Sequence, residues 1–229
     1  MTSKLFLHTH PYPPFLFEEA TKWLVGTLPP PRFSLGHLKE GDVNFSYGSR
    51  DGLLWPILNK LFDLDLKFET TREAIEQRAD FLRKQKIGIC DIVASAERLK
   101  IDASDLGMQN IELRDLLSYL RQYPNVHTLL FTGGNSKNGP EYFFRKHLKQ
   151  NNLTLETVSD KIPRIHQFEL PFTRNSKIRN RIIKTVSLTA PSGSANRSVG
   201  SLSAYKELKK NNLSFNTIDF RRLQYRPFF

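Results

Sequence analysis

The chain has 229 residues, 39% of them hydrophobic, so it can bury one substantial core, and we expect residues 1–229 to form a single domain. Its one cysteine, Cys90, excludes an intramolecular disulfide and an iron–sulfur cluster held by four thiolates of this chain. No apolar run reaches the roughly 18 residues of a membrane span, and the first ten residues do not resemble a signal peptide. These features predict a cytoplasmic protein without membrane association.

The net charge of +11 is spread unevenly along the chain. Residues 1–160 carry 20 Lys and Arg against 20 Asp and Glu, whereas residues 161–229 carry 14 against 3. A basic region of this kind favours a nucleic-acid partner, the alternative being a solvated basic surface.

Four apolar runs predict strands, at 23–28, 87–93, 126–132 and 182–188. They lack clean alternation of polar and apolar residues, which is typical of strands covered on both faces. Candidate helices lie between and after them, at 51–62, 72–85, 113–122, 139–150 and 201–211. The alternation predicts an α/β fold, a three-layer α/β/α sandwich with a central four-stranded parallel sheet.

Local signals support several boundaries. Thr71 precedes a helical pattern, and Gly139-Pro140 places a proline in the first turn of another helix. The cluster Pro29-Pro30-Pro31 predicts a rigid loop that continues neither a strand nor a helix.

Polar loops follow three of the predicted strands. They comprise residues 26–33 with their continuation 44–56, residues 133–135, and residues 189–198. The carboxyl ends of parallel strands are where open α/β sheets bind ligands, so these loops are expected to converge on one crevice. Because loop 189–198 lies in the basic region, a phosphate backbone is the first ligand to consider.

These residues carry a resemblance that spans about residues 22–210. The motifs are, in order, Gly26-Thr27-Leu28-Pro29, Tyr47-Gly48-Ser49-Arg50-Asp51 with Trp55-Pro56, Gly88 to Arg98, and Pro191-Ser192-Gly193-Ser194-Ala195-Asn196. Their order resembles the uracil-DNA glycosylase superfamily, most closely its hypoxanthine-DNA glycosylase branch. The Pro-Ser-Gly element is also similar to that of mismatch-specific uracil glycosylases.

The resemblance implies a monofunctional DNA glycosylase that initiates base excision repair without a metal or cofactor. The enzyme would hydrolyse the N-glycosidic bond of a deaminated base, uracil or hypoxanthine, flipped out of DNA. The loop after the first strand would bind the base and position water, and the last loop would enter the minor groove. No dinucleotide-binding or phosphate-loop motif indicates a nucleotide cofactor.

The predicted base pocket includes Gly26, Thr27 and Leu28, with Phe45 and Tyr47 as stacking partners. Core packing is the alternative for the two aromatic residues. Gly48 permits close backbone approach, and backbone N–H groups of the Gly26–Pro29 turn are candidates to stabilise the departing anion.

A polar residue is also expected beyond the third strand. The Asn135 amide is a candidate to read the base edge, with Thr132 as the alternative position.

The catalytic group departs from the wider superfamily, in which an Asp, Asn or Glu in the first motif commonly positions water. Here Thr27 and Leu28 occupy that motif. The resemblance to the hypoxanthine branch implies a polar residue in the stretch before Trp55-Pro56 instead, which makes Asp51 the candidate to orient or deprotonate water. An Asp before Gly and an apolar helical run is also typical of a turn or helix cap, which is the alternative.

In the last loop, Ser192, Ser194 and Asn196 are candidates to bond phosphates and the extruded nucleotide. Arg197 is a candidate to pair with a phosphate or enter the duplex gap. A simple strand-to-helix turn is the alternative.

A further group also matches the resemblance and is predicted to have a structural role in ion pairing or helix-end hydrogen bonding: Asp91, Ser95, Arg98 and Asp105. His8 and His10 have a spacing that suits a metal, but without a nearby carboxylate or cysteine in sequence they are interpreted as incidental, and no metal ligand is predicted.

Three functions remain open from the sequence. They are a DNA glycosylase, a non-catalytic nucleic-acid-binding protein with the same fold, and a small-molecule enzyme with an incidental basic tail. In each case a monomer is the default expectation.

Overall fold

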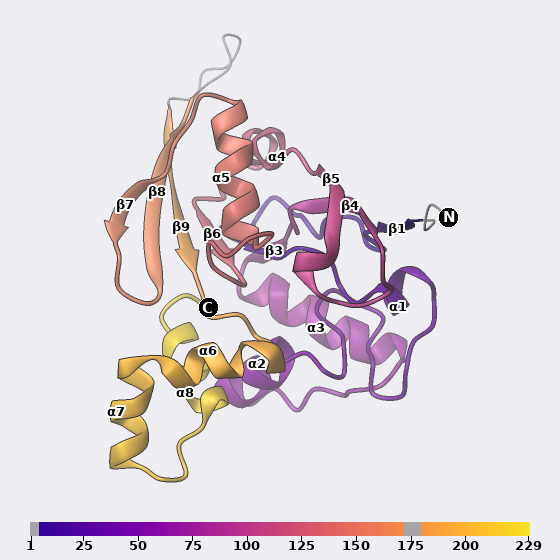
Figure 1. Cartoon of the computed structure of the whole chain (residues 1–229), viewed down its shortest axis with the longest axis vertical. Coiled ribbons are helices and arrows are strands. Elements are labelled where there is room, and N and C mark those ends of the chain that lie inside the picture. Colours follow the sequence, from indigo (N-terminus) through magenta and orange to yellow (C-terminus); the bar gives the residue numbers. More distant parts are fainter. Residues whose placement is uncertain (1–4, 172–179) are drawn as a thin grey trace.

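The computed structural model describes residues 5–171 and 180–229. The strands are β1 (Phe6–Thr9), β2 (Lys22–Val25), β3 (Ile87–Ile89), β4 (Val93–Arg98), β5 (Met108–Leu113), β6 (Thr128–Phe131), β7 (Glu156–Ser159), β8 (Arg164–Leu170) and β9 (Arg181–Ser187). The main sheet has the order β3-β2-β6-β9-β8-β7 (Figure 1). Its first four strands are parallel, and β8 and β7 extend it in antiparallel fashion.

The four predicted strands are the four parallel strands, which confirms the central sheet. The structure adds β8 and β7, which the sequence analysis missed. Strand β7 is almost wholly exposed at the sheet edge, so it lacks the apolar run by which the others were found. Strand β8 buries alternate residues over its second half, as a strand with one covered face does.

The helices are α1 (Pro31–Ser34), α2 (Leu54–Phe62), α3 (Arg72–Lys84), α4 (Leu116–Gln122), α5 (Pro140–Gln150), α6 (Asn196–Ser201), α7 (Ser203–Asn211) and α8 (Thr217–Tyr225), with 3-10 turns η1 (Asp105–Gly107) and η2 (Gly193–Ala195). Thr71 is the N-cap of α3, its hydroxyl accepting from the Ala74 N–H, and Gly139 is the N-cap of α5. No helix in the described part of the chain has the length and apolar content to cross a membrane.

Several predicted boundaries need correction, and α4, for example, begins at Leu116, three residues after its predicted start. The proline cluster does not remain wholly a loop, because Pro31 opens the short helix α1, where its missing N–H would have had no partner. Helix α2 begins at Leu54, three residues after the predicted start, and its N-cap is Leu53.

Each face of the main sheet carries its own core. One core contains Trp23, Val25 and Phe131, which pack with α4 and α5. The other core contains Leu24 and Leu130, which alternate with those residues along β2 and β6 and pack with α2, α3 and the end of α8. Because successive side chains of a strand point to opposite faces, four short apolar strands supply both cores. The three-layer architecture is therefore confirmed (Figure 1).

The run predicted as one strand at 87–93 divides between two sheets. Just beyond β3, the chain still contacts β2 and the residue after it, because the Cys90 and Ile92 N–H groups donate to the Leu24 and Gly26 carbonyls at 2.9 and 3.0 Å. It then continues as β4 in a second sheet of order β1-β4-β5. Asp91 therefore lies at the crossing, beside the end of β2.

A buried contact joins β1 to β4 in the second sheet. The Arg98 guanidinium donates to Nδ1 of His8 at 2.9 Å, and both side chains are almost completely buried. Burial, with the Arg98 charge as a second cause, lowers the pKa of His8 to about 4.

His8 should therefore make stability depend on pH. The unfolded chain takes up this proton near pH 6.5 and the folded chain near 4, so the contribution of His8 is full above 6.5 and is lost as pH falls toward 4. The loss is on the order of 3 kcal/mol. His8→Gln, whose amide oxygen still accepts from Arg98, should reduce the difference in unfolding free energy between pH 7 and 4.5. Urea denaturation at the two pH values tests this, with exposed His37→Gln as control; an unchanged difference in His8→Gln would contradict it.

Candidate active site

A cleft of about 690 Å³ opens where the carboxyl ends of β2, β6 and β9 meet the crossing between the two sheets. Its walls come from segments far apart in the sequence: His10 and Tyr12, Thr27 to Pro30 with Arg32, Ser46 to Ser49, Asp51, Gly52 and Leu54, Asp91, Ala103 to Asp105, Thr132, and Ala190 to Ser194. The structure thus brings the predicted loops after β2 and β9 together on one crevice. From the region after β6, Thr132 is the residue that lines it.

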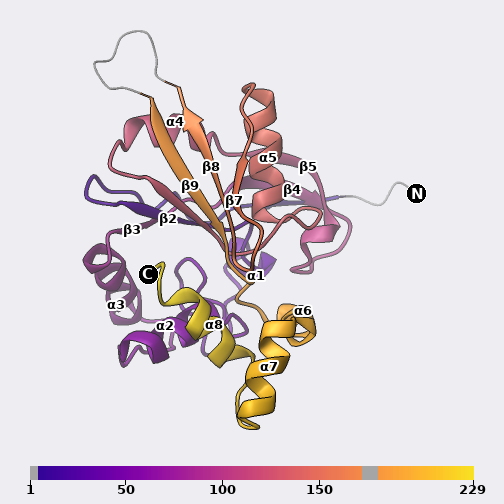
Figure 2. The ribbon, with the colours of Figure 1, turned by 90° about the vertical axis from the view of Figure 1, so that its left-hand side faces the viewer.

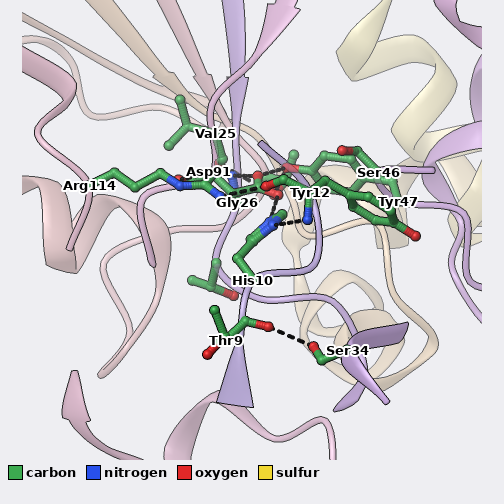
Figure 3. A network of polar contacts seen from close by, with 12 residues as sticks. Thr9, His10, Tyr12, Val25, Gly26, Ser34, Ser46, Tyr47, Asp91 and Arg114 are labelled. Carbon is green, nitrogen blue, oxygen red and sulfur yellow. Dashed lines mark hydrogen bonds and ion pairs between the residues drawn. The ribbon is translucent and has the colours of Figure 1, made fainter. Parts of the chain in front are cut away.

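Asp91 lies at the inner end of this cleft and joins three segments (Figure 3). Its Oδ1 accepts the Gly26 N–H at 2.6 Å and the Tyr47 hydroxyl at 2.7 Å. Its Oδ2 lies 3.0 Å from Nε2 of His10. The carboxylate, 6% exposed, thereby has three polar partners in place of water.

The protonation of the two partner side chains follows from their other contacts. The Tyr12 N–H donates to Nδ1 of His10 at 3.2 Å, which makes Nδ1 an acceptor and leaves Nε2–H to donate to Asp91. Burial, together with the charge of Asp91, holds the pKa of Tyr47 well above its usual range. Tyr47 therefore stays protonated, and its hydroxyl donates a hydrogen bond to Asp91.

Two glycines permit this arrangement. A Cβ on Gly26 would lie 2.4 Å from the Tyr47 hydroxyl oxygen, and one on Gly48 would lie 2.0 Å from the Val43 carbonyl oxygen. Gly48 therefore makes the predicted close backbone approach, next to Tyr47, which has a φ of 58° in the left-handed region. The expected role of the Gly26 N–H toward an anion needs correction, because Asp91 already accepts that N–H.

The other predicted pocket residues divide into two groups. Thr27, Leu28 and Tyr47 line the cleft. Phe45 instead packs in the core, with ring centroids 5.8 Å from Phe15 and 6.3 Å from Trp55. Asn135 is exposed and does not line the cleft. The two alternatives therefore fit the structure better: core packing for Phe45, and Thr132 in place of Asn135 as the polar residue after the third predicted strand.

Asp51 lies at the rim of the cleft, with 70% of its side chain exposed and Oδ2 3.3 Å from Nη2 of Arg32. It does not cap α2, whose N-cap Leu53 has no side-chain hydrogen bond. Arg32 is itself held by Asp42, to which its Nε and Nη2 donate at 2.8 and 2.7 Å.

Asp105 also faces the cleft, contrary to its predicted structural role. Its Oδ1 accepts from the Thr27 hydroxyl at 2.8 Å. Burial raises the pKa of Asp105, against the opposing effects of that hydrogen bond and of the Arg98 charge. Two other residues that were predicted to be structural lie away from the cleft lining. Arg98 is buried and donates to His8, and the Ser95 hydroxyl donates to Glu112 at 3.0 Å.

Helix α8 anchors the last polar loop, residues 189–198, through Arg221. The fully buried Arg221 donates to the Ala190 carbonyl at 2.9 Å, the Asn196 side-chain oxygen at 2.8 Å and the Ser192 carbonyl at 3.2 Å. The Leu53 N–H donates to the Pro191 carbonyl at 2.9 Å, which ties the loop to the start of α2. The loop is therefore more than a simple connection between β9 and α6.

The predicted DNA-contacting residues of this loop differ in availability. The side-chain oxygen of Asn196 accepts from Arg221 and Thr217, so the NH₂ group is the part of this amide that could donate to a phosphate oxygen. Ser192 and Ser194 line the cleft, their hydroxyl oxygens 3.0 Å apart. Arg197 is exposed, and within the described residues its guanidinium forms no ion pair.

Among the described residues, the C-terminal basic residues other than Arg197 do not gather at the cleft. Arg164 pairs with the buried Glu141, and Arg181, at the end of β9 remote from the cleft, donates to the Pro124, Val126 and Leu120 carbonyls. Three others, Arg174, Lys177 and Arg179, lie outside the described residues. Lys206, Lys209 and Lys210 belong to α7, which Figure 2 shows away from the main sheet.

Sequence reasoning missed the segment His10–Tyr12 as part of the site. His10 is not incidental, because it pairs with Asp91, and Tyr12 supplies an aromatic ring to the cleft. The alternation of His and Tyr with prolines was the available signal. Among the described residues, no group of three or more His, Cys, Asp or Glu is placed to hold a metal ion.

No protein-family model and no curated protein matches the chain. Among solved structures, it is similar to the solution NMR structure of a "putative Uracil DNA glycosylase" from Methanosarcina acetivorans, with a TM-score of 0.54 over 97% of this chain and 98% of that chain. The two chains share one fold. At 14% sequence identity, the likeness concerns architecture.

Asp91→Asn should destabilise the protein. The amide keeps one oxygen for Gly26 and Tyr47, but its NH₂ group faces the Nε2–H of His10, and two donors then oppose each other in a buried site. We expect the free energy of unfolding to fall by about 2–4 kcal/mol. Urea denaturation measures this against Asp80→Asn, an exposed control on α3, and equal stabilities of the two variants would show that the network contributes little.

Proposed function

We propose that this protein is a DNA glycosylase that hydrolyses the N-glycosidic bond of a deaminated base, uracil or hypoxanthine, flipped out of DNA, and so initiates base excision repair. The observation that carries the proposal is the cleft, which combines aromatic rings and carboxylates beside a rigidly held Pro-Ser-Gly loop at the carboxyl ends of parallel strands. The fold shared with the archaeal protein supports it.

The cleft has suitable chemistry for an extruded base. Its volume of about 690 Å³ lies within the usual range for small-ligand sites. Tyr12 and Tyr47 offer rings for stacking, and the Tyr47 hydroxyl, which donates a hydrogen bond to Asp91, retains an oxygen lone pair to accept an imide N–H. Uracil and hypoxanthine both present such a group, so either base fits this proposal.

Asp51 is the proposed acceptor of the proton from the attacking water. It is at the rim of the cleft, where solvent has access, and it belongs to the loop between the base pocket and α2. A carboxylate there would also stabilise the positive charge that develops on the sugar as the bond breaks.

The last loop is the proposed contact with the DNA strand. Gly193 is exposed with open space around its Cα, and Ser192 and Ser194 present hydroxyl groups that can bond phosphate oxygens. Arg197, three residues after Ser194, is exposed, and in the described part of the chain its guanidinium forms no ion pair. Because Arg221 anchors the loop through three acceptors, it meets the strand already ordered, which lowers the entropic cost of binding.

Asp51→Ala should abolish base removal while preserving affinity for DNA. The test uses single- and double-stranded oligonucleotides with one uracil, hypoxanthine or xanthine, incubated with protein and then with alkali to cleave abasic sites. We expect a loss of about 10²–10⁴-fold in the single-turnover rate. Asp80→Ala serves as the matched exposed control.

Unchanged turnover in Asp51→Ala would refute the assignment of this residue. DNA binding by the wild type with no cleavage of any oligonucleotide would instead support the alternative function, a non-catalytic nucleic-acid-binding protein. Absence of salt-dependent DNA binding would count against both functions.

Arg197→Ala should reduce activity more on duplex than on single-stranded substrate, because only a duplex presents a gap to be filled after the base leaves the stack. The slope of log affinity against log salt should fall by about 1 if the residue contacts one phosphate. Arg72→Ala, an exposed cation on α3, is the control. Equal effects of the two substitutions would argue against a DNA contact at Arg197.

A further inference from the structure

Three aspartates line the cleft, and their surroundings differ. Asp91 already accepts from Gly26 and Tyr47 and pairs with His10. Asp51 is largely exposed beside Arg32. Asp105 is partly buried, and in the described part of the chain Thr27 is the only hydrogen-bond partner of its carboxyl group, through Oδ1. Its Oδ2 therefore remains available to a bound molecule.

The backbone around Asp105 is firmly held, so the carboxyl group has a defined position. The buried Asn138 side chain donates to the Asp105 carbonyl at 2.9 Å and to the Met108 carbonyl at 3.2 Å. Arg98 donates to the Ser104 carbonyl at 2.6 Å from the other side of the turn. The partial burial that raises the pKa of Asp105 favours its protonated form, which can donate from Oδ2 while Oδ1 accepts from Thr27.

The departing base needs a group that neutralises its charge, and the backbone donors that remain in the neighbouring loop are the Thr27 and Leu28 N–H groups. When the C1′–N bond breaks, the electron pair leaves with the base, which becomes an anion unless it is protonated. The Gly26 N–H is taken by Asp91, and Pro29, Pro30 and Pro31 have no N–H. Thr27 directs its hydroxyl to Asp105. Hydrogen bonds from backbone groups can share the charge of the departing base, whereas a protonated carboxyl can remove that charge by giving up its proton.

We propose that Asp105, held by Thr27, is the general acid that protonates the departing base, while Asp51 accepts the proton of the attacking water. This inference rests on the proposed glycosylase function. The C1′–N electron pair passes to the base, Asp105 gives its proton to the base, and water oxygen bonds to C1′. The water proton passes to Asp51 and then to solvent, and Asp105 regains a proton from solvent after the base departs. The products are the free base and an abasic sugar.

The decisive variable is how stable the departing base is as an anion. An electron-withdrawing fluorine makes 5-fluorouracil a better leaving group than uracil, so its departure depends less on protonation. Asp105→Asn should slow single-turnover release of uracil by about 10²–10⁴-fold and release of 5-fluorouracil by a clearly smaller factor. In the wild type, uracil release should fall as pH rises through the raised pKa of Asp105, and Asp105→Asn should lack this limb.

Further variants separate the catalytic role from a structural one. Thr27→Val should slow uracil release by a smaller factor than Asp105→Asn does, and it should again slow uracil release more than 5-fluorouracil release. Thr27→Ser should keep the wild-type rates because it retains the hydroxyl. Asp80→Asn should leave both rates unchanged. DNA affinity and thermal stability of Asp105→Asn should match those of the wild type.

Equal losses on the two bases, or normal uracil release by Asp105→Asn, would overturn the inference while leaving the glycosylase proposal intact. A folded wild type that releases neither base would overturn both. If Asp105→Asn fails to fold, Thr27→Val decides the matter, since equal rates of that variant and the wild type on uracil would remove the role assigned to the pair.

Discussion

A buried carboxylate needs partners, and at Asp91 this requirement organises the whole candidate site. Removing an ionised group from water costs several kcal/mol unless hydrogen bonds replace its hydration. The donors that satisfy it come from the loop after β2, the Tyr47 turn and the segment after β1. Each donor fixes one wall of the cleft, so the shape of the cleft follows from the electrostatics of one side chain.

A buried cation has the corresponding effect on the other side of the cleft. Arg221 satisfies its guanidinium with acceptors from the loop after β9, and the Tyr225 hydroxyl donates to the Thr189 carbonyl at 2.6 Å. The C-terminal helix thereby determines the conformation of a loop that it follows in sequence. Much of the basic excess that favoured nucleic acid from composition alone has such internal uses, as at Arg164, Arg181 and Arg221.

The sequence predicted the four parallel strands because residues buried on both faces leave a continuous apolar run. It predicted the convergence of the strand-end loops because parallel strands present their carboxyl ends at one edge. It did not predict that Phe45 enters the core while Tyr47 faces the cleft, since that choice depends on a turn with positive φ at Tyr47. Nor did it predict the partners of Asp91 or the position of Asp105 in the cleft, because these depend on where distant segments meet.

The separation of those partners along the chain links the site to folding. Asp91 meets His10, Gly26 and Tyr47 across 81, 65 and 44 residues. Contacts of such long range form only after much of the chain has been ordered, because loop closure must come first. A partly folded chain in which these segments have not yet met would therefore lack the floor of the cleft. Selection for activity at such a site is at the same time selection for complete folding.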